Sequence, residues 1–300
     1  MPRTISSALL LSATLFLCST TLAYAGAKPS VADDQISGNA EFWLGYAFLS
    51  EGLPATVVDD DGYLALGGDF HLNIPAGGPT NFQLDLASET GFVDNSNDNY
   101  TGSVMGGGHF SFRDPSEWLV GAFAGAGNGF NADDDTVTAW VLGAEGQYYL
   151  PDWTLYGQLG YMDANDVGTG NNEAFRDAWF GRGVARFFID SNVKLEAELS
   201  YANGENDAPA TDMDVWGWGL RYERSLNSMN TSFFVAYEGN HFATDEIGDD
   251  GDDELTQHVI KLGLNVAFGV DGQKYIDRHG ATLDLPMVTR WAAYGSDVLD

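Results

Sequence analysis

Cysteine, basic residues and long apolar runs are all scarce in this chain of 300 residues. It has one cysteine, Cys18, and 13 Lys plus Arg against 44 Asp plus Glu, which gives a formal net charge of −31. A fold with a single thiol has to be held by packing and hydrogen bonds, because it lacks the means for an internal disulfide. Nucleic-acid binding depends on clustered cations, so the charge balance excludes nucleic acid as a partner.

The apolar content is nevertheless too high for a disordered acidic chain. Apolar residues make up 44% of the sequence and aromatic residues 13%, whereas disordered segments are poor in both. Beyond the N-terminus, no stretch approaches the roughly 18 consecutive apolar residues that a membrane-spanning helix needs. The chain should therefore fold, and it should do so without a transmembrane helix.

The first 25 residues have the three parts of a secretory signal peptide. Arg3 supplies the positive region, an apolar core follows over residues 8–18, and Ala23-Tyr24-Ala25 fits an A-x-A cleavage site. A short buried helix over residues 8–18 is the alternative, but the flanking residues favour the signal peptide. Leu17 before Cys18 does not fit a lipobox, so we predict export without a lipid anchor.

Beyond the signal, large apolar residues recur at every second position. From Glu41 to Phe48 the even-numbered residues are large and apolar, while the odd-numbered ones are mostly small or charged. This period is typical of a β-strand with two different faces. Twelve segments show it, near residues 38–50, 61–73, 80–93, 99–113, 117–126, 135–150, 152–163, 174–189, 192–204, 213–225, 229–243 and 254–269.

The connections between these segments alternate in length and charge. Five are short and rich in turn formers, at residues 75–79, 114–116, 151–152, 190–192 and 226–228. The other six are longer and acidic, and include residues 59–61, 94–98, 133–135, 163–171, 205–212 and 245–254. Short turns at one end and long loops at the other predict an all-β fold, a closed antiparallel transmembrane β-barrel of about 12 strands. A secreted acidic β-sandwich, with its apolar faces turned inward, is the alternative.

Two further features favour a membrane barrel. Aromatic residues such as Phe110, Trp118 and Trp153 lie beside the short turns, where an interfacial girdle needs them. The stretch 261–268 is similar to the terminal-strand signal recognised by the outer-membrane assembly machinery, through Lys261, Gly263, Val266 and Phe268. Over residues 1–268 the chain resembles the porin-like outer-membrane β-barrel proteins of Gram-negative bacteria. That family usually ends at the aromatic residue, whereas this chain continues to Asp300.

The resemblance implies an integral outer-membrane protein with periplasmic turns and extracellular acidic loops. It divides the chain into a signal peptide (1–25), an N-terminal periplasmic segment (26–37), the barrel (38–269) and a periplasmic C-terminal tail (270–300). The alternatives for the tail are a plug inside the lumen and a disordered terminus. The expected partners are outer-membrane lipid, the assembly machinery and, for a channel, small solutes. We expect no cofactor, and the oligomeric state stays open.

The inward strand faces should carry the function, because the outward faces meet lipid. They hold these charged residues: Glu41, Asp69, Asp85, Glu89, Glu145, Arg182, Arg186, Lys194, Glu196, Glu198, Arg221, Glu223, Glu238 and Lys261. An acidic wall on the early strands should face a partly basic wall on the later ones, as in pores that orient polar solutes. Since inward carboxylates outnumber cations, we predict a channel for small polar or cationic solutes. The alternative is a closed structural or adhesive barrel with a salt-bridged lumen.

Metal binding and catalysis are less favoured. Loop carboxylates that could bind Ca²⁺ or Mg²⁺ are Asp133, Asp134, Asp135, Asp249, Asp250, Asp252 and Asp253, but they lack EF-hand spacing and a solvated surface is favoured. The enzymatic alternative is an outer-membrane phospholipase, because Ser50 and His258 would be outward neighbours after closure. No serine-centred motif surrounds Ser50, and His71, His109, His241, His258 and His279 form no triad signature. We therefore predict a protein that is not an enzyme.

Overall fold

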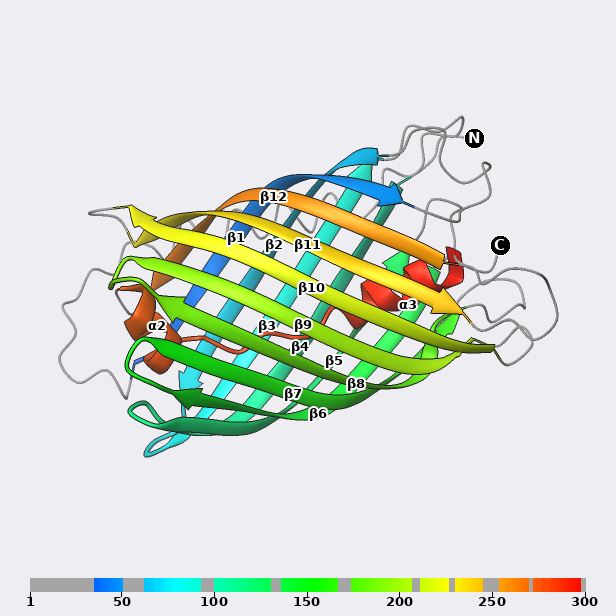
Figure 1. The fold of residues 1–300 in the computed structure, drawn as a ribbon. Coiled ribbons are helices and arrows are strands. Elements are labelled where there is room, and N and C mark those ends of the chain that lie inside the picture. Colours follow the sequence, from blue (N-terminus) through cyan, green and yellow to red (C-terminus); the bar gives the residue numbers. More distant parts are fainter. Residues whose placement is uncertain are drawn as a thin grey trace, which may run out of the picture.

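The computed structural model describes residues 35–50, 62–92, 100–130, 136–166, 174–206, 211–226, 230–244, 254–269 and 272–297. These residues form a closed antiparallel barrel of twelve strands, which confirms the predicted fold class (Figure 1). The strands are β1 (Ser37–Ser50), β2 (Gly62–Pro75), β3 (Thr80–Phe92), β4 (Tyr100–Asp114), β5 (Trp118–Phe130), β6 (Thr136–Tyr149), β7 (Trp153–Asp166), β8 (Arg176–Phe188), β9 (Val193–Asn206), β10 (Thr211–Leu226), β11 (Thr231–Thr244) and β12 (Glu254–Phe268). Each strand pairs with its sequence neighbours, and β1 pairs with β12 to close the ring.

The period-two pattern decides which side of each strand faces outward. Leu159 and Leu262 are 71% and 61% exposed on the outside, whereas Lys261, next to Leu262, is only 7% exposed. A closed ring leaves no sheet edge, so the backbone groups of the strands pair within the barrel and the apolar outer face suits a hydrocarbon environment. In a sandwich the large apolar side chains would face each other inside, so the structure excludes that alternative.

The two ends of the barrel differ in their connections. At the turn end, short segments join the strands, at residues 76–79, 115–117, 150–152 and 189–192. Gly77 and Gly78 in the first of these turns have φ angles of 93° and 60°, which glycine adopts without the strain that a Cβ would cause. At the other end, the loop end, the strands are joined by the acidic segments, which lie outside the described residues.

The C-terminal tail lies inside the barrel, which corrects the expectation of a periplasmic tail. α2 (Gln273–His279) lies at the turn end, where the backbone N–H of Gln273 donates to the carbonyl of Ser191 at 3.0 Å. Residues 280–287 then run along the lumen to α3 (Val288–Asp297), which lies towards the loop end (Figure 1). The tail is inside because its polar groups find their partners on the inner wall, as described below. Neither α2 nor α3 is long and apolar enough to cross a bilayer, nor is any other helix of the described residues.

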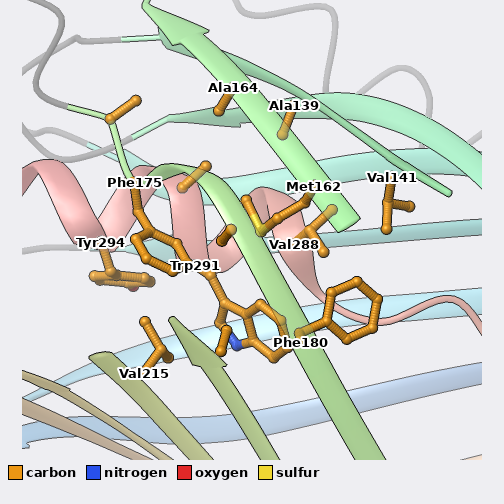
Figure 2. Close-up of a cluster of buried hydrophobic side chains, with 14 of the residues drawn as sticks. Ala139, Val141, Met162, Ala164, Phe175, Phe180, Val215, Val288, Trp291 and Tyr294 are labelled. Carbon is orange, nitrogen blue, oxygen red and sulfur yellow. The ribbon is translucent and has the colours of Figure 1, made fainter. Parts of the chain in front are cut away.

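An apolar cluster surrounds α3 near the loop end. Val288, Trp291 and Tyr294 are buried there among inward side chains of several strands, including Met162 and Phe180 (Figure 2). The rings of Trp291 and Phe180 meet edge to face with centroids 5.9 Å apart. The helix packs close against β5 as well, since a Cβ on Gly129 would collide with the carbonyl oxygen of Thr289. This cluster fills the lumen around α3.

Candidate functional site

A polar cavity of about 560 Å³ lies in the lumen on the turn-end side of the apolar cluster. Its wall is formed mainly by β1–β3 and β8–β12, and the C-terminal segment from Gly272 to Trp291 forms its other side. Residues at the turn end, such as Asn192 and Asn230, also line it. The cavity therefore reaches from α3 towards the turn end of the barrel.

The charged residues assigned to the lumen from sequence lie on or beside this cavity. Those that line it are Glu41, Asp69, Asp85, Glu89, Arg182, Arg186, Lys194, Glu196, Glu198, Arg221, Glu223, Glu238 and Lys261. Glu145 is buried beside it, where its Oε2 accepts hydrogen bonds from the Tyr156 hydroxyl at 2.7 Å and from Gln158 Nε2 at 3.2 Å. Their inward position follows from strand parity, and their role in conduction stays a prediction.

The expected separation of an acidic wall from a basic wall is replaced by direct pairing. Arg221 on β10 binds Glu41 on β1 through two bonds, of 2.8 Å from Nη1 and 2.6 Å from Nη2, although β11 and β12 lie between them in the ring. The same guanidinium lies 3.0 Å from Glu223 and 3.7 Å above the ring of Phe234. Ion pairs therefore bridge parts of the lumen that an open pore would leave hydrated.

Two arginines of β8 are paired with carboxylates of both the wall and the tail. Arg182 forms a bidentate ion pair with Glu198, with two N···O distances of 2.7 Å. Its Nη2 also lies 2.5 Å from the carboxylate of Asp284. Arg186 contacts Glu196 at 2.8 Å, and its Nη1 donates to Asp277 at 2.9 Å. Asp277 and Asp284 belong to the C-terminal segment, so the tail completes the charge balance of β8.

At Arg290 on α3 the charges are reversed: the base belongs to the tail and the carboxylates belong to the wall. Its guanidinium binds the carboxylate of Glu89 on β3 and lies 3.2 Å from Glu238 on β11, which also pairs with Lys261 at 2.7 Å. Burial disfavours the charge on Arg290, but these two carboxylates more than offset it and hold its pKa well above the ordinary value. The C-terminal segment is thus anchored by acids at one level of the lumen and by a base at another.

Histidines and carboxylates of several strands form a chain of contacts on the inner face of the wall. His71 Nδ1 lies 3.1 Å from Asp85, His109 Nε2 lies 2.9 Å from the same carboxylate, and His109 Nδ1 lies 2.8 Å from Glu145. Among the described residues, no group of three or more His, Cys, Asp or Glu side chains is arranged to hold a metal ion. The loop carboxylates Asp133–Asp135 and Asp249–Asp253 lie outside those residues.

Several residues of this site were not found from the sequence. On the wall these are Asn39, His71, Gln83, His109, Arg113, Gln147, Tyr156 and Gln158; on the tail they are Asp277, Asp284 and Arg290. The wall residues stand at inward positions of their strands, so strand parity was a usable signal for them. The tail has no strand period, and nothing in its sequence placed Asp277, Asp284 or Arg290 in the lumen.

The other sequence candidates have structural partners of their own. Lys261 Nζ lies 4.3 Å from the ring centre of Trp43, Gly263 lies against the ring of Phe234, and Val266 and Phe268 end β12 at the turn end. Their role in assembly stays a prediction. His258 stacks on Phe48, and its Nδ1 lies 2.9 Å from the Tyr237 hydroxyl. The backbone of Ser50 pairs with Thr256, and its side chain lies outside the described set.

Comparison with known proteins gives a likeness of fold. No family model matches the chain, and no curated protein matches its sequence. An outer membrane channel from Pseudomonas putida F1 matches with a TM-score of 0.51 at 9% identity, over 81% of this chain and 100% of the channel. The KdgM porin in complex with disordered oligogalacturonate (0.42, 10%, 76% and 99%) and an anion-selective porin from Comamonas acidovorans (0.39, 9%, 78% and 99%) also match. The chain has the fold of an outer-membrane β-barrel.

Proposed function

We propose that this protein is an integral outer-membrane channel for small polar or cationic solutes, and that its C-terminal segment has to move before the lumen conducts. The observation that carries this proposal is a large charged cavity enclosed by a barrel with an apolar outer face. A merely structural barrel needs no such cavity, because side chains can fill a small lumen completely. The proposed activity is passive diffusion rather than catalysis.

The charge of the cavity supports a preference for cations. Its acidic lining residues are Glu41, Asp69, Asp85, Glu89, Glu196, Glu198, Glu223, Glu238, Asp277 and Asp284, against Arg182, Arg186, Lys194, Arg221, Lys261 and Arg290. Glu41 and Asp69 also occupy directly paired positions of β1 and β2. Like charges at such positions repel each other, and Arg221 compensates Glu41, so the carboxylate that a mobile cation would stabilise is Asp69.

The C-terminal segment controls the path in this proposal. The apolar cluster around α3 fills the lumen towards the loop end, so a solute that enters the cavity meets the helix. The extended residues before α3 are held by hydrogen bonds, each of which changes the free energy by only about 0.5–1.5 kcal/mol when exchanged with water. They are also held by ion pairs of Asp277 and Asp284 with Arg186 and Arg182, and both arginines keep a wall carboxylate, Glu196 and Glu198, when the segment leaves. Movement of the segment is therefore compatible with an intact barrel.

A closed structural barrel is the second candidate, and the ion pairs favour it. The Arg221–Glu41 pair joins two wall strands without any contribution from the tail, so displacement of α3 would leave this bridge in place. If such pairs stiffen a lumen that never opens, the protein has no conductance. The two candidates differ in one measurable property.

Planar-bilayer recording of the full-length protein separates the candidates. Arg290→Glu places a carboxylate beside Glu89 and Glu238, and should expel α3 and raise the open probability at least about tenfold over the parent, since charge repulsion in a buried site costs several kcal/mol. Lys274→Glu is the matched control: it makes the same charge change in the same segment, but the partner of Lys274 among the described residues is the exposed Asp152 at the turn end. A silent bilayer for Arg290→Glu, despite verified incorporation of folded protein, establishes the closed barrel instead.

A further inference from the structure

The inner wall holds residues 280–284 as a binding protein holds an extended peptide. These residues belong to neither a helix nor a strand, yet each of their carbonyls accepts a hydrogen bond from a wall side chain. Arg113 donates to Gly280 at 2.8 Å, Asn39 to Ala281 at 3.3 Å, Arg186 to Thr282 at 3.0 Å, Gln83 to Leu283 at 2.5 Å and Gln158 to Asp284 at 2.9 Å. The donors come from β1, β3, β4, β7 and β8.

Gln83 binds the backbone in both directions. Its Nε2 donates to the carbonyl of Leu283, while its Oε1 accepts from the N–H groups of Thr282 and Leu283 at 3.1 and 3.2 Å. This is the pairing that a neighbouring strand would provide, made here by one side-chain amide. Because every residue other than proline carries these backbone groups, the contact selects an extended peptide and is indifferent to its side chains.

The side chains of the segment add selectivity at two adjacent positions. Leu283 is 2% exposed and packs in an apolar pocket formed by Leu119, Tyr149, Tyr156 and Val184. The carboxylate of Asp284 lies 2.5 Å from Arg182 and 3.3 Å from Arg186. The wall therefore selects an apolar residue followed by an acidic one.

The buried amides of the wall favour a binding site over a simple seal. Gln83, Gln147 and Gln158 are each nearly fully buried at inward positions, and a buried amide without a hydrogen-bond partner costs free energy. Each of them has a partner in the tail: Gln147 Nε2, for example, donates to the Thr282 hydroxyl at 3.2 Å. A seal needs only apolar packing, which α3 supplies with Val288, Trp291 and Ala292.

We propose that this part of the lumen is a binding site for an extended peptide with an apolar residue followed by an acidic residue, and that residues 280–284 occupy it as an internal ligand. The ligand class goes beyond the channel proposed above, because binding does not require that the barrel conducts. A tethered segment competes at an effective concentration that reaches the millimolar range. An external peptide therefore binds measurably only when the internal ligand is weakened.

The test uses the full-length protein in detergent micelles and a labelled peptide of residues 280–286, Gly-Ala-Thr-Leu-Asp-Leu-Pro. The variant Leu283→Ser with Asp284→Asn weakens the internal ligand and leaves the wall unchanged. We expect it to bind the peptide at least about tenfold more tightly than the parent does, measured by fluorescence anisotropy. The matched control peptide, Gly-Ala-Thr-Ser-Asn-Leu-Pro, should bind at least about tenfold more weakly, because a hydrogen-bonded charge pair and an apolar contact are both lost.

A wall variant and a second release variant keep the result decisive. Adding Gln83→Ala to the weakened protein should lower affinity at least about fivefold, since the peptide loses the one wall side chain that both donates to its backbone and accepts from it. Arg290→Glu loosens the tail at α3, outside the peptide-binding wall, and should also increase binding of the native peptide. Equal binding of the two peptides, or no gain over the parent in either folded variant, overturns the proposal. Such a failure leaves the conductance test of the channel untouched.

Discussion

The side-chain amide of Gln83 and the backbone of Leu283 form two hydrogen bonds with each other, one in each direction. The two residues are 200 positions apart in the sequence, one on β3 and the other in the tail. This contact joins the barrel wall to a segment that belongs to no sheet. Its loss leaves polar groups of both partners without their bonds.

Gln83→Ala should loosen the tail while the barrel remains folded. A buried donor or acceptor left unsatisfied costs about 1–3 kcal/mol, and the Leu283 backbone would carry both. We expect faster proteolysis within residues 280–297 in detergent, with an unchanged barrel band in semi-native electrophoresis. Asn81→Ala is the control, because the side chain of Asn81 bonds an exposed turn carbonyl, that of Pro79, and no tail residue that the structure describes. Equal cleavage rates in the two variants would contradict the assigned contact.

Breaking the Arg221–Glu41 pair should destabilise the barrel itself. Removing one partner of a fully buried ion pair typically costs about 3–5 kcal/mol, and a smaller loss is expected here because the two side chains are 17% and 13% exposed. The loss should be smaller for Glu41→Gln, in which Arg221 keeps Glu223 at 3.0 Å, than for Arg221→Met. Glu41→Gln and Arg221→Met should therefore each lower the denaturant midpoint for unfolding in detergent. The double variant should recover part of the loss, because no charge is then left alone. Additive losses in the double-mutant cycle would show that the two residues act independently.

Gly129→Ala should displace α3 from β5. The added Cβ would collide with the Thr289 carbonyl oxygen, and overpacking of this kind costs about 1–3 kcal/mol. More frequent openings in bilayer recordings are expected if the segment controls the path. Gly183→Ala on β8 is the control, because a Cβ there meets no atom within 4 Å. Identical open probabilities for the two variants would separate α3 from the conduction path.

Asp69→Asn should reduce the cation preference of the open channel. The change removes a carboxylate from the cavity wall, where field lines are focused by the low-dielectric barrel. The reversal potential in a potassium chloride gradient should shift towards zero when Arg290→Glu is used as the conducting background. Glu117→Gln, in an exposed turn, should leave the reversal potential unchanged. A shift of the same size for both variants would exclude Asp69 from the selectivity of the pore.

Much of the wall could be predicted from the sequence, because strand parity is a local property. Glu41 lies inward since the chain alternates large apolar and small or charged residues around it, and Lys261 follows the same rule on β12. Strand parity does not show, however, which inward side chains contact each other. It placed Glu41 and Arg221 on inward faces without showing that the two charges meet across two intervening strands.

The residue pattern alone encodes the twelve two-faced strands, their apolar outer surface and the end of the barrel at which the short turns lie. These features follow from a period of two and from turn-forming residues, which act over a few positions. The contents of the lumen, in contrast, depend on contacts between residues far apart in the chain. The tail has no strand period of its own. Its position depends on wall residues that closure of the ring brings together, namely Arg182, Arg186, Glu89 and Gln83. A local sequence pattern cannot predict such a long-range arrangement.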